Sequence, residues 1–322
     1  MSKYYRALLC FFAPFLLAAI PASGQELDAP AAPPVDSQVS EINTLAPTAQ
    51  VDQLDASQPT TNSSESGFFD STFKHFRAYE PIYFVYGPWP SDIKFQFSVK
   101  YKFYDPSLPM DRLLSIPGFL QRIYFAYSQT SLWDLQDPNE PFFYDSSYRP
   151  EGFVEIDKTD LPGLSAPKNW DYNVLLGGGH ESNGQKIPDH RAMNSLFIQP
   201  TITFNNLFGD DTTNYFLLIS PRIHNYADDI SQNPDIPKYR GYCDFNAAFG
   251  QADGWQISFL GRLGSSCDQG SAQFDWTYPL QNLLKGVDLC LDIQYFVGYG
   301  DTLLDYNRST SKLRIGVCLY RY

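Results

Sequence analysis

IKFQFSVKYKF, residues 93–103, alternates apolar and polar side chains without a break. Its six apolar residues share one face of an extended chain and its five polar residues share the other, because successive strand side chains point to opposite faces. In a soluble sandwich the apolar face would be core. In an outer-membrane barrel it would face lipid, while the polar face lined the interior. The pattern therefore predicts a strand, and strand length has to decide between the two environments.

Comparable stretches recur along the chain and are mostly longer than the five or six residues usual in globular proteins. A tilted strand needs about 9–11 residues to cross a bilayer. Twelve candidates lie at residues 81–88, 93–104, 120–133, 145–157, 171–182, 194–206, 213–225, 238–250, 254–264, 271–279, 287–298 and 310–322. An even number allows an antiparallel bacterial barrel to close. We therefore expect an all-β fold, a 12-stranded antiparallel transmembrane β-barrel over residues 68–322.

The N-terminal region differs from the rest of the chain. Residues 1–24 have the features of a signal peptide: Lys3 and Arg6 precede an apolar run, and small residues then predict cleavage before Gln25. Residues 25–67 are rich in Pro, Ala and Ser and poor in large apolar residues. Such a segment cannot bury enough surface to offset its ordering entropy, so we expect a disordered periplasmic tail.

The charge and amino-acid composition of the chain argue against two classes of protein, nucleic-acid-binding proteins and helical membrane proteins. The net charge is −13, which argues against nucleic-acid binding because phosphate contacts need clustered Lys and Arg. The mean hydropathy of −0.31 does not suit a helical membrane protein, whereas 16% aromatic residues suit an all-β protein. Export would leave four cysteines, Cys243, Cys267, Cys290 and Cys318, without metal-type spacing. The sequence leaves open whether they form disulfides or remain free thiols.

One local group has the parts of a hydrolase site. His180 and Ser182 share a strand face, so the imidazole can accept the hydroxyl proton. If the next strand pairs as a hairpin, Asn194 returns beside His180, and its amide oxygen can accept the other ring N–H. The same His-x-Ser pair is also compatible with two polar residues near a barrel rim.

The alternation of side chains along a strand predicts which face of the sheet carries His180, Ser182 and Asn194. His180 and Ser182 share a face with Val174 and Leu176, and Asn194 shares one with Leu196. All three residues therefore fall on the apolar face, which in a barrel faces lipid. A site that faces the membrane favours a lipid substrate. Two other functions are compatible with a barrel. One is a non-catalytic structural or pore-like barrel, although twelve strands leave only a small lumen. The other is an outer-membrane protease, for which the sequence lacks the paired acidic residues that such a site would need.

Five separated motifs resemble the outer-membrane phospholipase A family of Gram-negative bacteria. The first is His180-Glu181-Ser182-Asn183-Gly184 with Asn194 at the same spacing as in the family. The others are YSQTSLW at 127–133, NPDIPKY at 233–239, GYGD at 298–301 and LDYN at 304–307. They are spread over residues 127–307, which is most of the expected barrel.

This resemblance implies calcium-dependent hydrolysis of acyl ester bonds in glycerophospholipids and lysophospholipids (phospholipase A1/A2), in the outer membrane. It makes Ser182 the nucleophile, His180 the general base and acid, and Asn194 the residue that orients the imidazole. The oxyanion would be held by the Ser182 backbone N–H and calcium-bound water. It also implies a homodimer with Gln129 at the interface, where a polar group facing lipid needs a partner.

The calcium ligands are also implied by the resemblance, with departures from the family pattern. Gln185 would supply a main-chain oxygen, and the partner's ligand would correspond to Asn139. The family's hydroxyl ligand corresponds to His190, although calcium prefers oxygen. Asp189 could substitute for it. A looser acidic position falls at residues 228–229.

Overall fold

The computed structural model describes residues 75–104, 121–136, 143–158, 160, 167–209, 214–227, 230 and 233–322. All of them belong to one unit, Ser64–Tyr322. The expected signal peptide at 1–24 and the expected tail at 25–67 lie outside the described residues.

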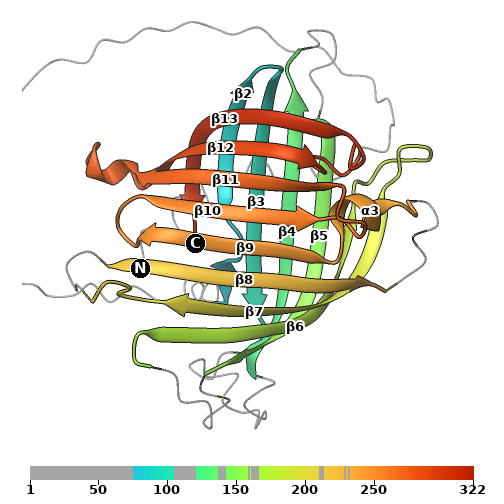
Figure 1. Cartoon of the computed structure of the whole chain (residues 1–322). Helices are drawn as coiled ribbons and strands as arrows, with labels where there is room; N and C mark the ends of the chain where they lie inside the picture. The colour runs from blue at the N-terminus through green and yellow to red at the C-terminus, as the bar shows by residue number, and fades with distance from the viewer. Residues whose placement is uncertain are drawn as a thin grey trace, which may run out of the picture. The chain divides into compact units, whose positions relative to one another are not determined.

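Twelve long strands form a closed antiparallel β-barrel, as the alternation predicts (Figure 1). They are β2 (Ile82–Pro88), β3 (Ser91–Lys102), β4 (Ile123–Asp134), β5 (Phe143–Asp157), β6 (Trp170–Ser182), β7 (Ala192–Phe204), β8 (Tyr215–Tyr226), β9 (Cys243–Gln251), β10 (Gln256–Leu263), β11 (Gly270–Pro279), β12 (Cys290–Tyr299) and β13 (Ser309–Tyr320). Each strand from β3 to β13 pairs with its neighbour in sequence, and β2 closes the barrel by pairing with both β13 and β3. A short strand, β1 (Phe76–Ala78), pairs with the far end of β3.

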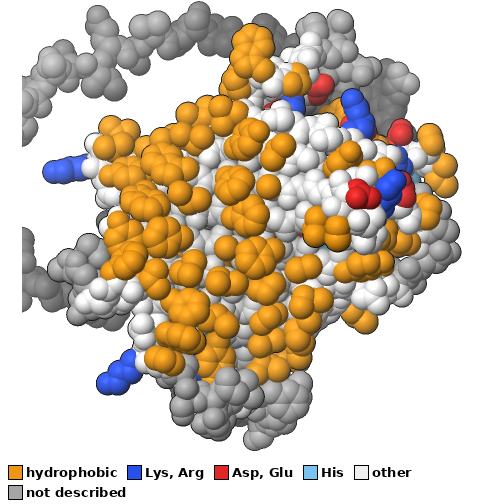
Figure 2. All heavy atoms as spheres, in the orientation of Figure 1, with side chains coloured by type: hydrophobic (Ala, Val, Ile, Leu, Met, Phe, Trp, Pro, Cys, Tyr) orange, Lys and Arg blue, Asp and Glu red, His pale blue; other side chains and the backbone are white. Residues whose placement is uncertain are grey.

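The two faces of the strands have the environments that alternation predicts. On β3 the side chains of Asp92, Lys94 and Ser98 are buried inside the barrel. The outer surface is an apolar belt, and Figure 2 shows hydrophobic side chains spread over it with charged side chains at its margins. Exposed members of this belt include Leu196, Ile198, Ile202, Ile223, Phe245, Ile257, Phe274, Tyr295, Val297, Leu313 and Ile315. This distribution suits a barrel surrounded by lipid.

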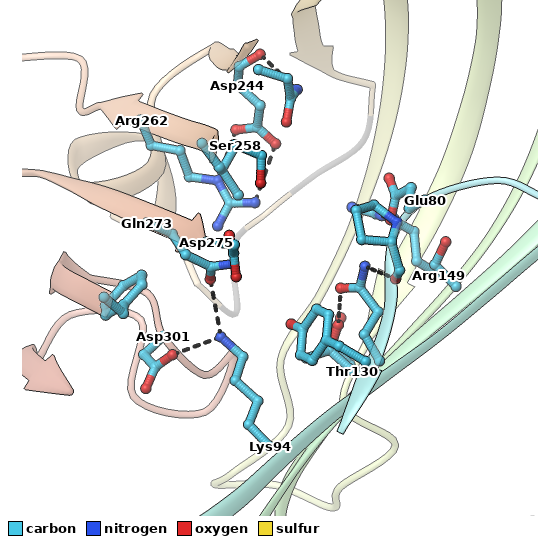
Figure 3. A pocket seen from close by; sticks show the side chains of 18 of the residues that line it. Glu80, Lys94, Thr130, Arg149, Asp244, Ser258, Arg262, Gln273, Asp275 and Asp301 are labelled. Carbon is cyan, nitrogen blue, oxygen red and sulfur yellow. Dashed lines mark hydrogen bonds and ion pairs between the residues drawn. The ribbon is translucent and has the colours of Figure 1, made fainter. Parts of the chain in front are cut away.

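Paired charges fill the interior. Lys94 Nζ lies 2.8 Å from an oxygen of Asp301, and Figure 3 shows its side chain pointing between Asp301 and Gln273. Arg314 Nε donates to Asp92 Oδ1 at 2.8 Å. Such pairing is what buried charges require. The polar cavity among these side chains has a volume of about 190 Å³.

One expected strand begins later than the sequence pattern indicates. Within the stretch predicted as strand at 238–250, residues up to Arg240 belong to a short helix, α3 (Ile236–Arg240), and β9 begins at Cys243. Proline in the first turn suits a helix start, because its fixed φ is already helical. Gly241, with φ of 65°, ends the helix.

The described helices are too short or too polar to cross a membrane. Cys243, Cys267, Cys290 and Cys318 are all free thiols. Cys290 and Cys318 stand opposite each other on β12 and β13.

Candidate active site

The β6–β7 hairpin brings together the residues that the sequence singled out. In its register His180 stands opposite Asn194, and Ser182 stands opposite Ala192. His180 Nδ1 and Asn194 Oδ1 are 2.7 Å apart, which is a hydrogen bond. The expected return of Asn194 to the side of His180 is therefore present in the fold.

These side chains lie on the outer face of the barrel. Leu176 on β6 and Leu196 on β7 share their parity and are 41% and 63% exposed. His180, Ser182 and Asn194 themselves are half-buried. The imidazole and the hydroxyl occupy the same strand face two residues apart, although none of the hydrogen bonds found among the described residues joins them.

A tyrosine that the sequence did not single out lies next to Ser182. Tyr148 on β5 pairs with Ser182, and its ring lies 3.2 Å from where a Cβ on Gly184 would stand. Gly184 also has φ of 66°, a conformation that favours glycine, so the chain can turn directly after the serine. No local motif points to Tyr148, because finding it requires the register between β5 and β6.

Asn183 organises the loop that follows Ser182. It is buried, and its side-chain oxygen accepts the backbone N–H of Arg191 at 2.9 Å. Its amide donates to the carbonyl oxygen of Asp189 at 2.8 Å. Arg191 in turn donates to the carbonyl oxygen of Leu304 at 3.3 Å, which ties the loop to the β12–β13 connection.

The expected calcium ligands are only partly brought together. His190 Nδ1 hydrogen-bonds the carbonyl oxygen of Gln185 at 3.0 Å, so this histidine occupies the carbonyl that was expected to bind the metal. The Asp189 side chain is exposed on the same loop. The described residues contain no cluster of three or more His, Cys, Asp or Glu suited to a metal. Asn139 and residues 228–229 lie outside the described residues.

Gln129 lies on the same outer face as the hairpin site. The strand registers align Ser182 with Tyr148 and Tyr148 with Gln129 across β6, β5 and β4. The Gln129 side chain accepts from the Tyr127 hydroxyl at 2.9 Å and donates to Ser131 Oγ at 3.1 Å. A polar strip therefore runs from Ser182 through Tyr148 to Gln129 on a surface that is mostly apolar.

A closed barrel with an apolar belt and a serine, a histidine and an asparagine on its lipid-facing side belongs to the class of outer-membrane barrels with a hydrolase-type site. Comparison with known proteins identifies the family. A family model described as Phospholipase A1 matches residues 76–319. The chain therefore belongs to the phospholipase A1 family, a family of ester hydrolases of the Gram-negative outer membrane.

Individual relatives agree with this assignment. Phospholipase A1 of Escherichia coli strain K12 is 26% identical over 231 residues, covering 71% of this chain and 69% of the relative. A putative phospholipase A1 of Neisseria meningitidis is 28% identical over 204 residues, covering 61% of this chain. The chain spans about half, 48%, of that relative's length.

Solved structures share the fold. Outer membrane phospholipase A from Escherichia coli superposes with a TM-score of 0.60 at 22% identity, covering 76% of this chain and 92% of that chain. The Salmonella typhi outer membrane phospholipase, a dimer with bound calcium, also gives 0.60, at 21% identity with the same coverage.

Proposed function

We propose that this chain is a calcium-dependent phospholipase A1/A2 that hydrolyses acyl ester bonds of glycerophospholipids and lysophospholipids in the outer membrane. The observation that carries the proposal is the hydrogen bond between His180 and Asn194, beside Ser182, on the lipid-facing side of the barrel. Membership of the phospholipase A1 family supports the same reaction.

The three side chains have complementary roles in this reaction. When His180 donates its Nδ1–H to Asn194, its Nε2 remains basic. Nε2 takes the proton from Ser182 Oγ as that oxygen attacks the ester carbonyl carbon, and it passes the proton to the departing alkoxide oxygen. A water that loses its proton to the same nitrogen then attacks the acyl-enzyme. Fatty acid is released and the serine hydroxyl is restored.

The orientation of the site explains a neutral third residue. A carboxylate facing lipid would cost several kcal/mol near the bilayer midplane and less at the interface. The Asn194 amide can orient the imidazole without most of that cost. A phospholipid in the surrounding membrane can reach the serine without entering the barrel.

Calcium fits the oxygen donors of the β6–β7 loop. The Gln185 carbonyl oxygen and the Asp189 carboxylate are of the type that calcium prefers. His190 offers nitrogen instead of oxygen and hydrogen-bonds the Gln185 carbonyl, so we do not propose it as a calcium ligand. Asn139 of a second copy is the proposed third ligand. Bound calcium would supply positive charge toward the oxyanion, an effect commonly worth about 10²–10³ in rate per donor.

A homodimer would complete this site. Gln129 lies two strands from Ser182 on the outer face, and its polar strip would meet the same strip of a second copy. Polar groups in lipid favour such pairing because lipid offers no alternative hydrogen bonds. The Salmonella typhi relative is a dimer, which agrees with this proposal.

A non-catalytic barrel is the second candidate function, because no hydrogen bond among the described residues links Ser182 to His180. The filled interior, with pairs such as Arg314–Asp92, speaks against the pore-like form of this alternative.

Fatty-acid release separates the two candidates. Refolded protein would be assayed on phospholipid micelles with calcium or with a chelator, beside Ser182→Ala. The enzyme hypothesis predicts release with calcium, little with chelator, and a loss on the order of 10³-fold or more in the variant. Equal inactivity of both proteins in every condition would support the non-catalytic barrel.

A further inference from the structure

The inner side of the catalytic hairpin is held by a specific pair of contacts. The cross-strand pair Glu181–Met193 lies between the pair His180–Asn194 and the pair Ser182–Ala192. Because strand side chains alternate, Glu181 and Met193 point into the barrel directly behind the three outward-facing residues. Contacts that fix the Glu181 and Met193 side chains therefore also fix the backbone that carries His180, Ser182 and Asn194.

Both inner residues contact helix α3. Arg240 Nη1 lies 3.2 Å from each carboxylate oxygen of Glu181, and Ser147 Oγ on β5 donates to one of these oxygens at 2.7 Å. Met193 packs in a buried cluster with Ile236, which is 0% exposed. One five-residue helix therefore braces both strands of the hairpin from inside.

The helix is itself fixed from two sides. The Tyr306 hydroxyl donates to Asp235, and the Tyr239 ring packs against those of Tyr299 and Tyr306. The Ser265 backbone N–H donates to the carbonyl oxygen of Pro237 at 2.9 Å. The NPDIPKY and LDYN motifs thus meet in one assembly behind the site. Neither motif contains a residue that takes part in the proposed proton transfers or nucleophilic attack.

The Glu181–Arg240 ion pair is largely shielded from solvent, so losing one partner has a larger effect than at the surface. The two side chains are only 15% and 11% exposed. Burial alone would lower the pKa of Arg240, but the carboxylates of Glu181 and Asp244 outweigh it, and the pKa is raised. Arg240 therefore stays charged, and removing it would take from the Glu181 carboxylate the one cation that hydrogen-bonds it among the described residues, leaving Arg149 as the other nearby positive charge.

We propose that Arg240 is a positioning residue for the proposed lipase reaction: through Glu181 it holds the strand on which His180 and Ser182 stand. Arg240 touches neither the substrate nor the reacting atoms. This inference rests on the proposed function for its kinetic consequence, but its structural consequence, a fixed His180–Asn194 hydrogen bond, can be measured without any turnover.

The test compares Arg240→Met with Arg122→Met, which removes another partly buried arginine from the carboxylates of Asp157 and Asp160 at the opposite end of β5. We expect Arg240→Met to lower kcat on the order of 10- to 100-fold with little change in KM, because small displacements of reacting groups have effects of this size. Arg122→Met should retain wild-type kcat, and Arg240→Lys should recover part of the loss.

A spectroscopic measurement on the same refolded proteins makes the inference independent of activity. The chain has four histidines, so ¹⁵N-histidine NMR can follow the Nδ1–H proton of His180, assigned with His180→Gln. The signal should persist in wild type and Arg122→Met and disappear by solvent exchange in Arg240→Met. An intact signal in folded Arg240→Met, or an equal loss in Arg122→Met, would overturn the inference. An inactive wild type with these NMR results would instead overturn the proposed function.

Discussion

Asn194 shows how far single residues can be interpreted from sequence. Strand parity and spacing place it beside His180 on the outer face, and the hydrogen bond at 2.7 Å agrees. The role of His190 could not be inferred in the same way. Its hydrogen bond to the Gln185 carbonyl depends on the loop conformation between β6 and β7, which alternation does not describe. Strand residues were therefore more predictable than loop residues.

Asn194 can be tested by two substitutions. Asn194→Ala removes the group that fixes the imidazole, so kcat should fall by about 10-fold or more, with the barrel intact by its electrophoretic mobility. Asn194→Asp should also be less active at neutral pH, because a carboxylate on the lipid-facing surface is costly to ionise. Fatty-acid release from micelles measures both. Full activity of Asn194→Asp would contradict the explanation for a neutral residue.

His190 can be tested through calcium. His190→Ser frees the Gln185 carbonyl oxygen and adds a hydroxyl oxygen of the kind calcium accepts. The calcium concentration giving half-maximal activity should therefore fall severalfold relative to wild type. Lys186→Ser on the same loop is a control, because the Lys186 side chain makes no hydrogen bond or ion pair among the described residues. An unchanged calcium requirement in His190→Ser would count against Gln185 as a ligand.

At the scale of elements, apolar alternation predicted the strands well because each carries one lipid-facing and one interior face. It did not predict helix α3, since residues 238–240 continue an acceptable strand pattern. Alternation takes no account of the proline in the first turn or of the buried contacts of Ile236, both of which favour the helix. Nor did it predict the Tyr148–Ser182 pairing, which depends on register between strands. The hairpin site was found because its residues are close in sequence. The contacts behind it involve residues far apart in the chain.

Two glycines, Gly152 on β5 and Gly177 on β6, allow a test of how closely these two strands pack. A Cβ on Gly177 would lie 2.4 Å from the backbone oxygen of Gly152, whereas a Cβ on Gly152 would meet nothing within 4 Å. Gly177→Ala should therefore destabilise the barrel by about 1–3 kcal/mol, in line with the effect of overpacking. Gly152→Ala should be close to neutral. Urea unfolding in detergent compares the two, and equal stabilities would show that the strands separate easily at this point.

At the scale of the whole molecule, the lipid-facing polar strip is the feature that a single barrel does not explain. Within the part of the chain that the structure describes, the Gln129 amide hydrogen-bonds neighbours on its own face, Tyr127 and Ser131. A second copy would cover this strip and bring its own residues toward the Ser182 site. The proposed dimer therefore connects the barrel surface to activity.

Gln129→Ala should weaken this dimer. The fraction of chemically cross-linked dimer in detergent with calcium and a substrate analogue should fall severalfold, with activity falling in parallel, because the polar contact in lipid is lost. Ser311→Ala, an exposed polar residue on β13, is the matched control and should leave both unchanged. Dimerisation that is equal in the three proteins would exclude Gln129 from the interface.

The central claim is that Ser182 is the nucleophile, and covalent labelling tests it most directly. Refolded protein would be treated with a hydrophobic sulfonyl fluoride in the presence of calcium and then analysed by peptide mass spectrometry. We expect modification of the peptide that contains Ser182, with loss of activity in proportion, and strongly reduced labelling in His180→Gln because the hydroxyl loses its base. Absence of label on Ser182, or equal labelling without His180, would contradict the proposed mechanism.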